Sequence, residues 1–479
     1  MSKCLRTSNL PSKRALLAIC TCSVIALLFA GCGNNNQQTG SPAPPSPGNK
    51  SVTVPPLPPG FPTPVVSGNV PVTIPLPNTN LTPEQARPFF DAFSWESFIA
   101  LNWPSAAAQR GTPSQPNSPD TFLKAGNGYQ TVWGSYRDAM DLYDSGSQRP
   151  PEWNSPSTSL VCKDVAANTK VFEMVAKGST VLDDINQAFS YPLIDQFKNY
   201  AMFEVRFNET QYDFIRGQNG QESTYLYLLK NLINPIQMPA GGSSSGEGST
   251  MLKAAWREMT STDDQSRYYV ITAQVYDPMS KQCSQKQMGL VGFHIVRKLK
   301  EFPEWIWSTF EQVDNVQRGH DAKPTTPISF NNGTANPQTQ GGWANRPPSK
   351  SPNLQPLDQR VPVQVTRNNP IPTTPQGAST IDVNNIYQKV LAGTVWQYYE
   401  LVFTQWPSDP GSFKLMENGG IYPQGSGAAF PQNGVTNTVM ETYFQSQNDA
   451  AGAGGNSCMN CHYKADSTDY SWSLKRRAH

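Results

Sequence analysis

Hydrophobic side chains recur with a period of two through the middle of the chain. Residues 201–207 place an apolar side chain at every second position, which predicts a half-buried strand. The same reasoning predicts four further strands, at Met251–Met259, Tyr268–Tyr276, Met288–Leu299 and Glu304–Asn315. Because short, turn-rich links join these strands, we expect them to pair as an antiparallel meander.

Helical patterns lie on either side of the strands. The run Thr82-Pro83-Glu84-Gln85 predicts a helix start, with Thr as the N-cap, Pro in the first turn and Gln three positions on. Pro104 ends this helix, whose tryptophans we expect to pack in the core. The other predicted elements are a helix over 383–391, an aromatic strand from Thr394 to Trp406, and a last helix with Met440, Tyr443 and Phe444 on one face.

Composition divides the chain into three parts. Residues 1–31 have the pattern of a signal peptide, and residues 32–80 that of a disordered Pro- and Asn-rich tether. Residues 81–479 are expected to form a single large domain, with insertions of little regular structure near 240–249 and 318–376. The predicted fold class is α+β, an antiparallel sheet body with flanking helices and the C-terminal segment packed against it.

The first 32 residues predict export. Four basic residues precede a mostly apolar stretch from Ala15 to Phe29, which is too short to span a membrane comfortably. The tetrad Phe29-Ala30-Gly31-Cys32 resembles a bacterial lipobox, which implies a lipid anchor on Cys32. With Gly33 following, the resemblance implies the outer membrane, facing the periplasm or the cell surface. The alternative is a simple cleaved signal with a soluble product.

The net charge excludes one class of partner. The formal charge of +1 becomes −3 when the signal leaves, because four basic and no acidic residues leave with it. Neither value indicates nucleic-acid binding.

The sharpest motif lies near the C-terminus, at Cys458-Met459-Asn460-Cys461-His462. Cys-x-x-Cys-His is the attachment pattern for c-type haem, in which two thiols bind one porphyrin and the adjacent imidazole binds iron. On a helical turn, Cys458, Cys461 and His462 share one face. The motif resembles that of c-type cytochromes, and this resemblance implies one covalently attached haem c with His462 as the metal ligand.

Two other chemistries use a Cys-x-x-Cys pair. A zinc site needs a second pair of ligands, and no other Cys or His pair in the chain has such spacing. A thioredoxin-like redox pair belongs after the first strand of a βαβ unit, not near the end of the chain. Export agrees with haem attachment, because bacteria attach haem covalently outside the cytoplasm.

The remaining cysteines pair off by elimination. Three of the eight lie in the signal, one takes lipid and two take haem. In an oxidising compartment, the remaining Cys162 and Cys283 are most simply a disulfide. Two buried thiols are the alternative.

Several phrases outside the motif resemble the long monohaem cytochrome c family proteins exported by Gram-negative bacteria. The resemblance spans most of Thr82 to Leu474 and implies haem binding and redox activity, but no substrate. The phrases are Phe93-Ser94-Trp95, Ala100-Leu101-Asn102-Trp103-Pro104, Gly289-Leu290-Val291-Gly292-Phe293-His294-Ile295, Trp307-Ser308-Thr309-Phe310-Glu311, Thr404-Gln405-Trp406-Pro407, Met440-Glu441-Thr442-Tyr443 and Ser457-Cys458-Met459.

Several residues are candidates for the second axial ligand of the iron. Only a terminal His and no Met follows the motif, so any distal protein ligand must come from the upstream body. His294, Met440 and His320 are the candidates, and Met416 and Met288 are less well placed. The alternative is that no protein side chain binds there.

The sequence thus predicts an electron carrier more than a catalyst. A filled distal position suits one-electron transfer with a redox partner, which the sequence does not identify. The first alternative is a haem enzyme, peroxidase- or oxygenase-like, with an open distal position. The second is a surface binding module in which haem fastens the C-terminal segment.

Overall fold

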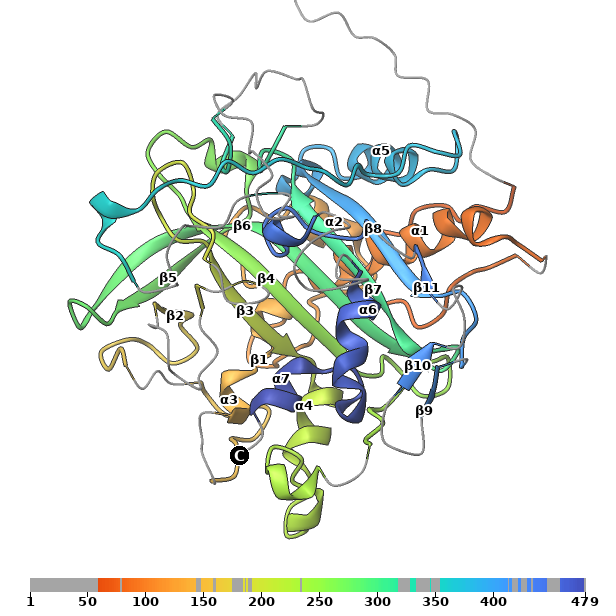
Figure 1. Ribbon diagram of the computed structural model, residues 1–479, viewed down its shortest axis with the longest axis horizontal. Helices are drawn as coiled ribbons and strands as arrows, with labels where there is room; N and C mark the ends of the chain where they lie inside the picture. Colours follow the sequence, from red (N-terminus) through yellow and green to blue (C-terminus); the bar gives the residue numbers. More distant parts are fainter. Residues whose placement is uncertain are drawn as a thin grey trace, which may run out of the picture. The chain divides into compact units, whose positions relative to one another are not determined.

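The alternating stretches form one large sheet, which dominates the computed structural model of the chain (Figure 1). Its nine strands are β1 (Arg137–Asp138), β2 (Val171–Glu173), β3 (Met202–Phe207), β4 (Thr250–Glu258), β5 (Val270–Asp277), β6 (Gln282–Leu299), β7 (Phe302–Gln312), β8 (Tyr399–Pro407) and β11 (Ala429–Phe430). A separate hairpin pairs β9 (Phe413–Leu415) with β10 (Ile421–Pro423).

The helices are short apart from the first. They are α1 (Pro83–Leu101), α2 (Pro119–Leu123), α3 (Met140–Tyr143), α4 (Glu209–Arg216), α5 (Thr380–Val390), α6 (Cys458–His462) and α7 (Trp472–Arg477). The structure describes residues 59–77, 80–143, 148–157, 161–174, 184–185, 187, 192–232, 235–317, 328–332, 345, 354–411, 413–415, 421–423, 429–431, 434–445 and 457–477.

The strand order is β1-β3-β4-β6-β7-β8-β11, and every neighbour on this path is antiparallel. The predicted α+β fold on an antiparallel sheet is therefore confirmed. The simple meander is wrong, because β4 pairs with β6 and leaves out β5. The long strand β6 explains this: β5 pairs with its first half, and β7 pairs with its second half on the same edge. At the outer side of β5, β2 adds a parallel pairing.

Helix α1 begins where the sequence predicts and covers one face of the sheet. Thr82 and Gln85 form a capping box, in which each side chain accepts a hydrogen bond from the other's backbone N–H. Phe98 stacks on Phe310 of β7, with ring centroids 4.4 Å apart. Trp95 stacks on Tyr387 of α5 at 5.4 Å. Trp95 thus packs in the core as predicted, and Trp103, which lies just beyond the end of α1, is also buried and stacks on Phe122.

A buried polar seam joins α1 to the same sheet face. The Ser94 hydroxyl lies 2.7 Å from the hydroxyl oxygens of both Ser308 and Thr404. Thr404 and Thr380 donate hydrogen bonds to the two carboxylate oxygens of Asp91, at 2.7 and 2.8 Å. Burial raises the pKa of Asp91 to about 6, although both hydroxyls act in the opposite direction.

Two segments that were expected to lack structure make defined contacts. Residues 59–77, from the predicted tether, lie against the body: Gly68 N–H donates to the Pro116 carbonyl at 2.8 Å, and Phe61 packs on Phe89. The 240–249 segment is a tight turn, in which Gly242 N–H donates to the Gly246 carbonyl at 2.9 Å. Much of 318–376 lies outside the described residues, but 354–376 is described.

The predicted helix around Met440 is wrong in extent, because it shrinks to the 3-10 turn Thr442–Phe444. Side chains there bind the backbone in place of a continuing helix. Asn437 N–H donates to the Glu441 carboxylate at 3.0 Å, and Thr438 N–H donates to Glu311 of β7. The predicted strand from Thr394 likewise begins with the 3-10 turn Val395–Tyr398, and β8 follows it.

Asp91→Asn is expected to flatten the pH dependence of stability. Between about pH 4 and 6, folded Asp91 holds a proton that the unfolded chain has released, so the free energy of unfolding should fall as pH rises through this window. The fall amounts to about 3 kcal/mol. Urea unfolding at several pH values measures it in wild type and variant. Asp358→Asn, at an exposed position, is the control and should leave the profile unchanged. Equal slopes for wild type and Asp91→Asn would contradict the assignment.

Candidate functional site

The Cys458–His462 motif forms helix α6, which lies across the sheet face opposite α1 and contacts β7 (Figure 1). The helical turn places Cys458, Cys461 and His462 on one side, as the spacing predicts. Both cysteines are thiols rather than a disulfide, and both are partly buried. Burial raises the pKa of the Cys458 thiol well above its ordinary value, so this thiol is protonated near neutral pH.

Two adjacent rows of cross-strand neighbours build the floor under α6. Paired residues on neighbouring strands share a face of the sheet, so each row presents its side chains together. The first row is Phe207, Met251, Val296, Trp307 and Gln405, and the second is Val205, Lys253, His294, Thr309 and Phe403.

Gln405 of β8 holds the start of α6. Its side-chain carbonyl accepts a hydrogen bond from Met459 N–H at 2.9 Å, and its amide donates to the Ser457 hydroxyl at 2.7 Å. The first turn of a helix has backbone N–H groups without helical partners, and this buried amide satisfies one of them. Gln405 thereby fixes the point at which the motif meets the sheet.

His462 has the orientation of a metal-binding imidazole. Its Nδ1 lies 2.8 Å from the Tyr470 carbonyl oxygen. A carbonyl only accepts hydrogen bonds, so Nδ1 carries the proton and Nε2 keeps the lone pair. Burial lowers the pKa of His462 to about 4, which keeps the imidazole neutral near neutral pH. The ring packs on Trp307, with centroids 4.5 Å apart.

The Tyr470 carbonyl is itself held by a buried anchor. The preceding residue, Asp469, pairs with Lys298 of β6 and accepts hydrogen bonds from Trp305 Nε1 at 3.2 Å and Met238 N–H at 2.7 Å. Asp469 and Tyr470 both have positive φ, 51° and 67°. Non-glycine residues rarely adopt this conformation, and here the surrounding contacts hold the turn that directs the carbonyl to His462.

Charged groups stand in the second row of the floor. His294 Nε2 lies 3.4 Å from Glu441 Oε2 and makes no hydrogen bond within the described part of the chain. Burial would raise the pKa of Glu441, but His294, Lys253 and the Asn437 N–H hold it below its ordinary value. Burial lowers the pKa of Lys253, which Glu441 and Cys461 offset in part.

The distal candidates have different surroundings. His294 stands on the motif's side of the sheet, one row from Trp307. Met440 is fully buried, and its methyl group lies 3.1 Å from where a Cβ on Gly292 would be, so it packs against β6. Met288 is buried where β6 pairs with both β4 and β5. His320 and Met416 lie outside the described residues.

The donor set fits a covalently attached haem. Two thiols and a neutral imidazole stand on one helical turn, and a backbone carbonyl fixes the tautomer that leaves the lone pair on Nε2. Among the described residues, no group of three or more His, Cys, Asp or Glu side chains could hold a metal ion by itself.

The sequence predicted the motif but not the residues that hold it. Gln405, Trp307 and Glu441 lie in segments that resemble the cytochrome family, but their pattern assigns them no role, and no local pattern marks Asp469. Lys253 carried a usable signal, since it is a lone charge inside an apolar strand segment.

Cys162 and Cys283 lie at disulfide-bonding distance, with Cα atoms 5.9 Å apart. None of the helices in the described ranges is both long and apolar enough to cross a membrane. The predicted signal and lipid site fall outside these ranges. Comparison of the chain with models of protein families, with curated proteins and with solved structures finds no match.

Asp469→Asn is expected to lower the free energy of unfolding by roughly 3–5 kcal/mol, because it leaves the buried Lys298 ammonium unpaired. Chemical denaturation measures the loss. Asp120→Asn, which breaks an exposed pair with Lys124, is the matched control and should cost no more than about 1 kcal/mol. Equal losses in the two variants would show that Asp469 does not anchor the segment.

Proposed function

We propose that this chain is an exported, lipid-anchored protein that binds one haem c and transfers single electrons. The observation that carries the proposal is the hydrogen bond from His462 Nδ1 to the Tyr470 carbonyl, on the same helical turn as the two thiols. This bond selects the tautomer that leaves Nε2 for iron, and it accompanies two thiols at the spacing that haem attachment uses.

In the proposed function the chain's residues have distinct roles. Cys458 and Cys461 hold the porphyrin through thioether links, and His462 binds the iron. Gln405 positions the start of the motif, and Asp469 positions the carbonyl that orients His462. A bound haem would supply a one-electron couple between ferric and ferrous iron.

Attachment is tested by mass. After expression in a host that matures c-type cytochromes, we expect the mature protein to carry the added mass of one haem, and Cys458→Ala/Cys461→Ala to lack it. Met459→Leu changes a motif residue that does not bind porphyrin, so it should keep the added mass. A colourless wild-type protein without added mass would end the proposal. So would a double variant that still retains haem mass.

The visible spectrum separates the carrier from the enzyme alternative. A low-spin spectrum unchanged by cyanide or carbon monoxide is expected of the carrier, because both axial positions of the iron are filled. High-spin iron that binds either ligand readily would favour the enzyme. The His294→Ala variant tests whether His294 is the second axial ligand of the iron. Conversion of a low-spin spectrum to a high-spin one in this variant would identify His294 as that ligand.

Lys253 is expected to raise the reduction potential of the bound haem. A nearby positive charge destabilises ferric iron more than ferrous iron, so Lys253→Met should lower the potential by on the order of tens of millivolts. Redox titration of the haem measures this. Lys124→Met removes the same charge at an exposed position and should leave the potential unchanged, because solvent screens it. An unchanged potential in Lys253→Met would place the lysine outside the field of the haem.

A further inference from the structure

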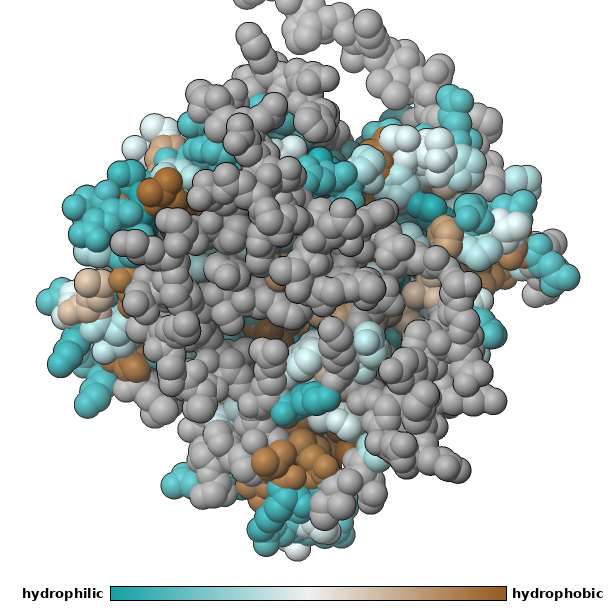
Figure 2. Space-filling model, in the orientation of Figure 1, coloured by the Kyte–Doolittle hydropathy of each residue, from teal (hydrophilic) through white to brown (hydrophobic). Residues whose placement is uncertain are grey.

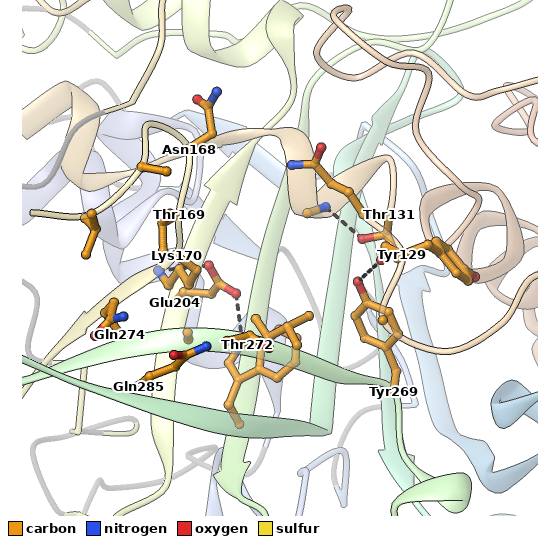
Figure 3. A pocket seen from close by; sticks show the side chains of 18 of the residues that line it. Tyr129, Thr131, Asn168, Thr169, Lys170, Glu204, Tyr269, Thr272, Gln274 and Gln285 are labelled. Carbon is orange, nitrogen blue, oxygen red and sulfur yellow. Dashed lines mark hydrogen bonds and ion pairs between the residues drawn. The ribbon is translucent and has the colours of Figure 1, made fainter.

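A polar cavity opens on the α1 side of the sheet, away from the motif. Its volume is about 550 Å³, within the range of small-molecule sites. The walls come from loops 128–134 and 164–170 and from strands β3 to β6 (Figure 3). Glu204 lies in register with Ala254 and Phe293, and Phe293 packs on Phe98 of α1. The cavity and the motif therefore use opposite faces of the same strands.

Charges in the cavity wall neutralise one another. Lys170 Nζ lies 2.8 Å from Asp138 and 3.0 Å from Glu204, and Arg206 Nε lies 2.7 Å from Glu204. Trp256 Nε1 also donates to Glu204, at 2.7 Å. Burial would raise the pKa of Glu204, but Arg206 and Lys170 lower it to about 2, so the carboxylate is ionised. The two cations pair with Glu204 and with Asp138, which lies behind the lining, so these four groups together carry no net charge.

The rim offers neutral hydrogen-bonding groups instead. Gln130, Gln274 and Gln285 line the cavity, and their side-chain amides make no hydrogen bond within the described part of the chain. Each amide provides two donors and one acceptor, which matches the mixed donors and acceptors of hydroxyl groups. The exposed carboxylate of Asp164 also lines the cavity and disfavours anions.

The described surface of the protein also carries some exposed hydrophobic side chains. Figure 2 views the α6 side of the sheet, opposite the cavity, and its described surface is mostly hydrophilic with a hydrophobic area at its foot. Within the described residues, the exposed large hydrophobic side chains are spread along the sequence. They are Val65, Leu76, Phe197, Leu229, Met279, Leu357 and Val361.

Covalent and backbone contacts hold the cavity walls in place. The Cys162–Cys283 disulfide ties the 161–170 loop to β6, two residues before Gln285. Gln274 N–H donates to the Lys170 carbonyl at 2.9 Å, so β5 also holds this loop. Gln274 and Gln285 face each other as cross-strand partners. The backbone that carries these amides is therefore in place before a ligand binds, so binding needs to order only the side chains.

We propose that this cavity binds a neutral polyhydroxylated ligand, a short stretch of oligosaccharide. Compensated charges in the wall, unpaired amides at the rim and a fixed frame together suit a ligand that is rich in hydroxyls and carries no charge. The proposal does not depend on haem binding, because the two sites lie on opposite faces of the sheet.

Isothermal titration calorimetry of the full chain tests the proposal, with maltotriose, cellotriose and chitotriose as neutral probes and with citrate and spermidine as charged ones. We expect at least one trisaccharide to bind and neither charged probe to do so. Gln274→Leu/Gln285→Leu should weaken that binding at least tenfold, because it removes amides that pair with hydroxyls. Gln282→Leu, an exposed glutamine of the same strand outside the cavity, should leave it unchanged.

Three results would overturn the proposal: no trisaccharide binding at millimolar concentration, binding of a charged probe alone, or trisaccharide binding that the double variant leaves intact. Thermal unfolding of each variant checks that the fold is retained. If the double variant does not fold, Gln130→Leu makes the same test from the opposite wall, with the same tenfold loss expected and an unchanged affinity overturning the site.

Discussion

The buried pair between Asp469 and Lys298 is the constraint on which the C-terminal segment depends. Lys298 belongs to β6, at the centre of the sheet, and Asp469 follows the motif by seven residues. Burying both charges is costly, and the cost is offset only because Trp305 and a backbone N–H also bind the carboxylate. The turn that results aims the Tyr470 carbonyl at His462. A residue that touches no cofactor thus determines which imidazole nitrogen is available for binding.

The sheet serves two purposes because its side chains alternate. One face carries Phe293, Ser308 and Phe310 toward α1, where aromatic stacking and a hydroxyl seam close the core. The other face carries Lys253, His294 and Trp307 toward α6. Each strand contributes to both, so the core and the candidate site share a rigid frame. Sites supported by strands hold their geometry better than sites supported by loops.

Local sequence patterns predicted the structural features that depend on interactions between neighbouring residues. The strands from β3 to β7 and the capping box of α1 were predictable because alternation and capping involve neighbouring residues. The pairing of β4 with β6 was not, because nothing in the sequence shows that β6 is long enough to hold two partners on one edge. The helix expected around Met440 failed for a related reason, since Glu311 comes from a distant strand and accepts hydrogen bonds from the Thr438 backbone N–H and hydroxyl.

In the candidate site, too, the sequence predicted the residues that are close together in the chain and missed those that act through long-range contacts. Cys458, Cys461 and His462 form a compact motif, so spacing alone identified them. Gln405, Lys298 and Asp469 act through contacts that span 52 or more residues of sequence. The periodicity of hydrophobic residues in the sequence does not indicate such long-range contacts. A lone lysine inside an apolar strand was the one trace of the electrostatic environment that the sequence carried.

The Cys458–His462 motif follows, in sequence, all the strands against which it packs, and this order has a consequence for maturation. If the chain is exported as proposed, it crosses a membrane from its N-terminus and delivers β4, β6, β7 and β8 before Cys458 emerges. The docking surface can therefore be complete when the thiols arrive, and docking partly buries them. Under the proposed function, modification and burial then compete for the same two sulfur atoms. The enzyme that attaches porphyrin would then have to act before Gln405 forms its hydrogen bonds with the start of α6.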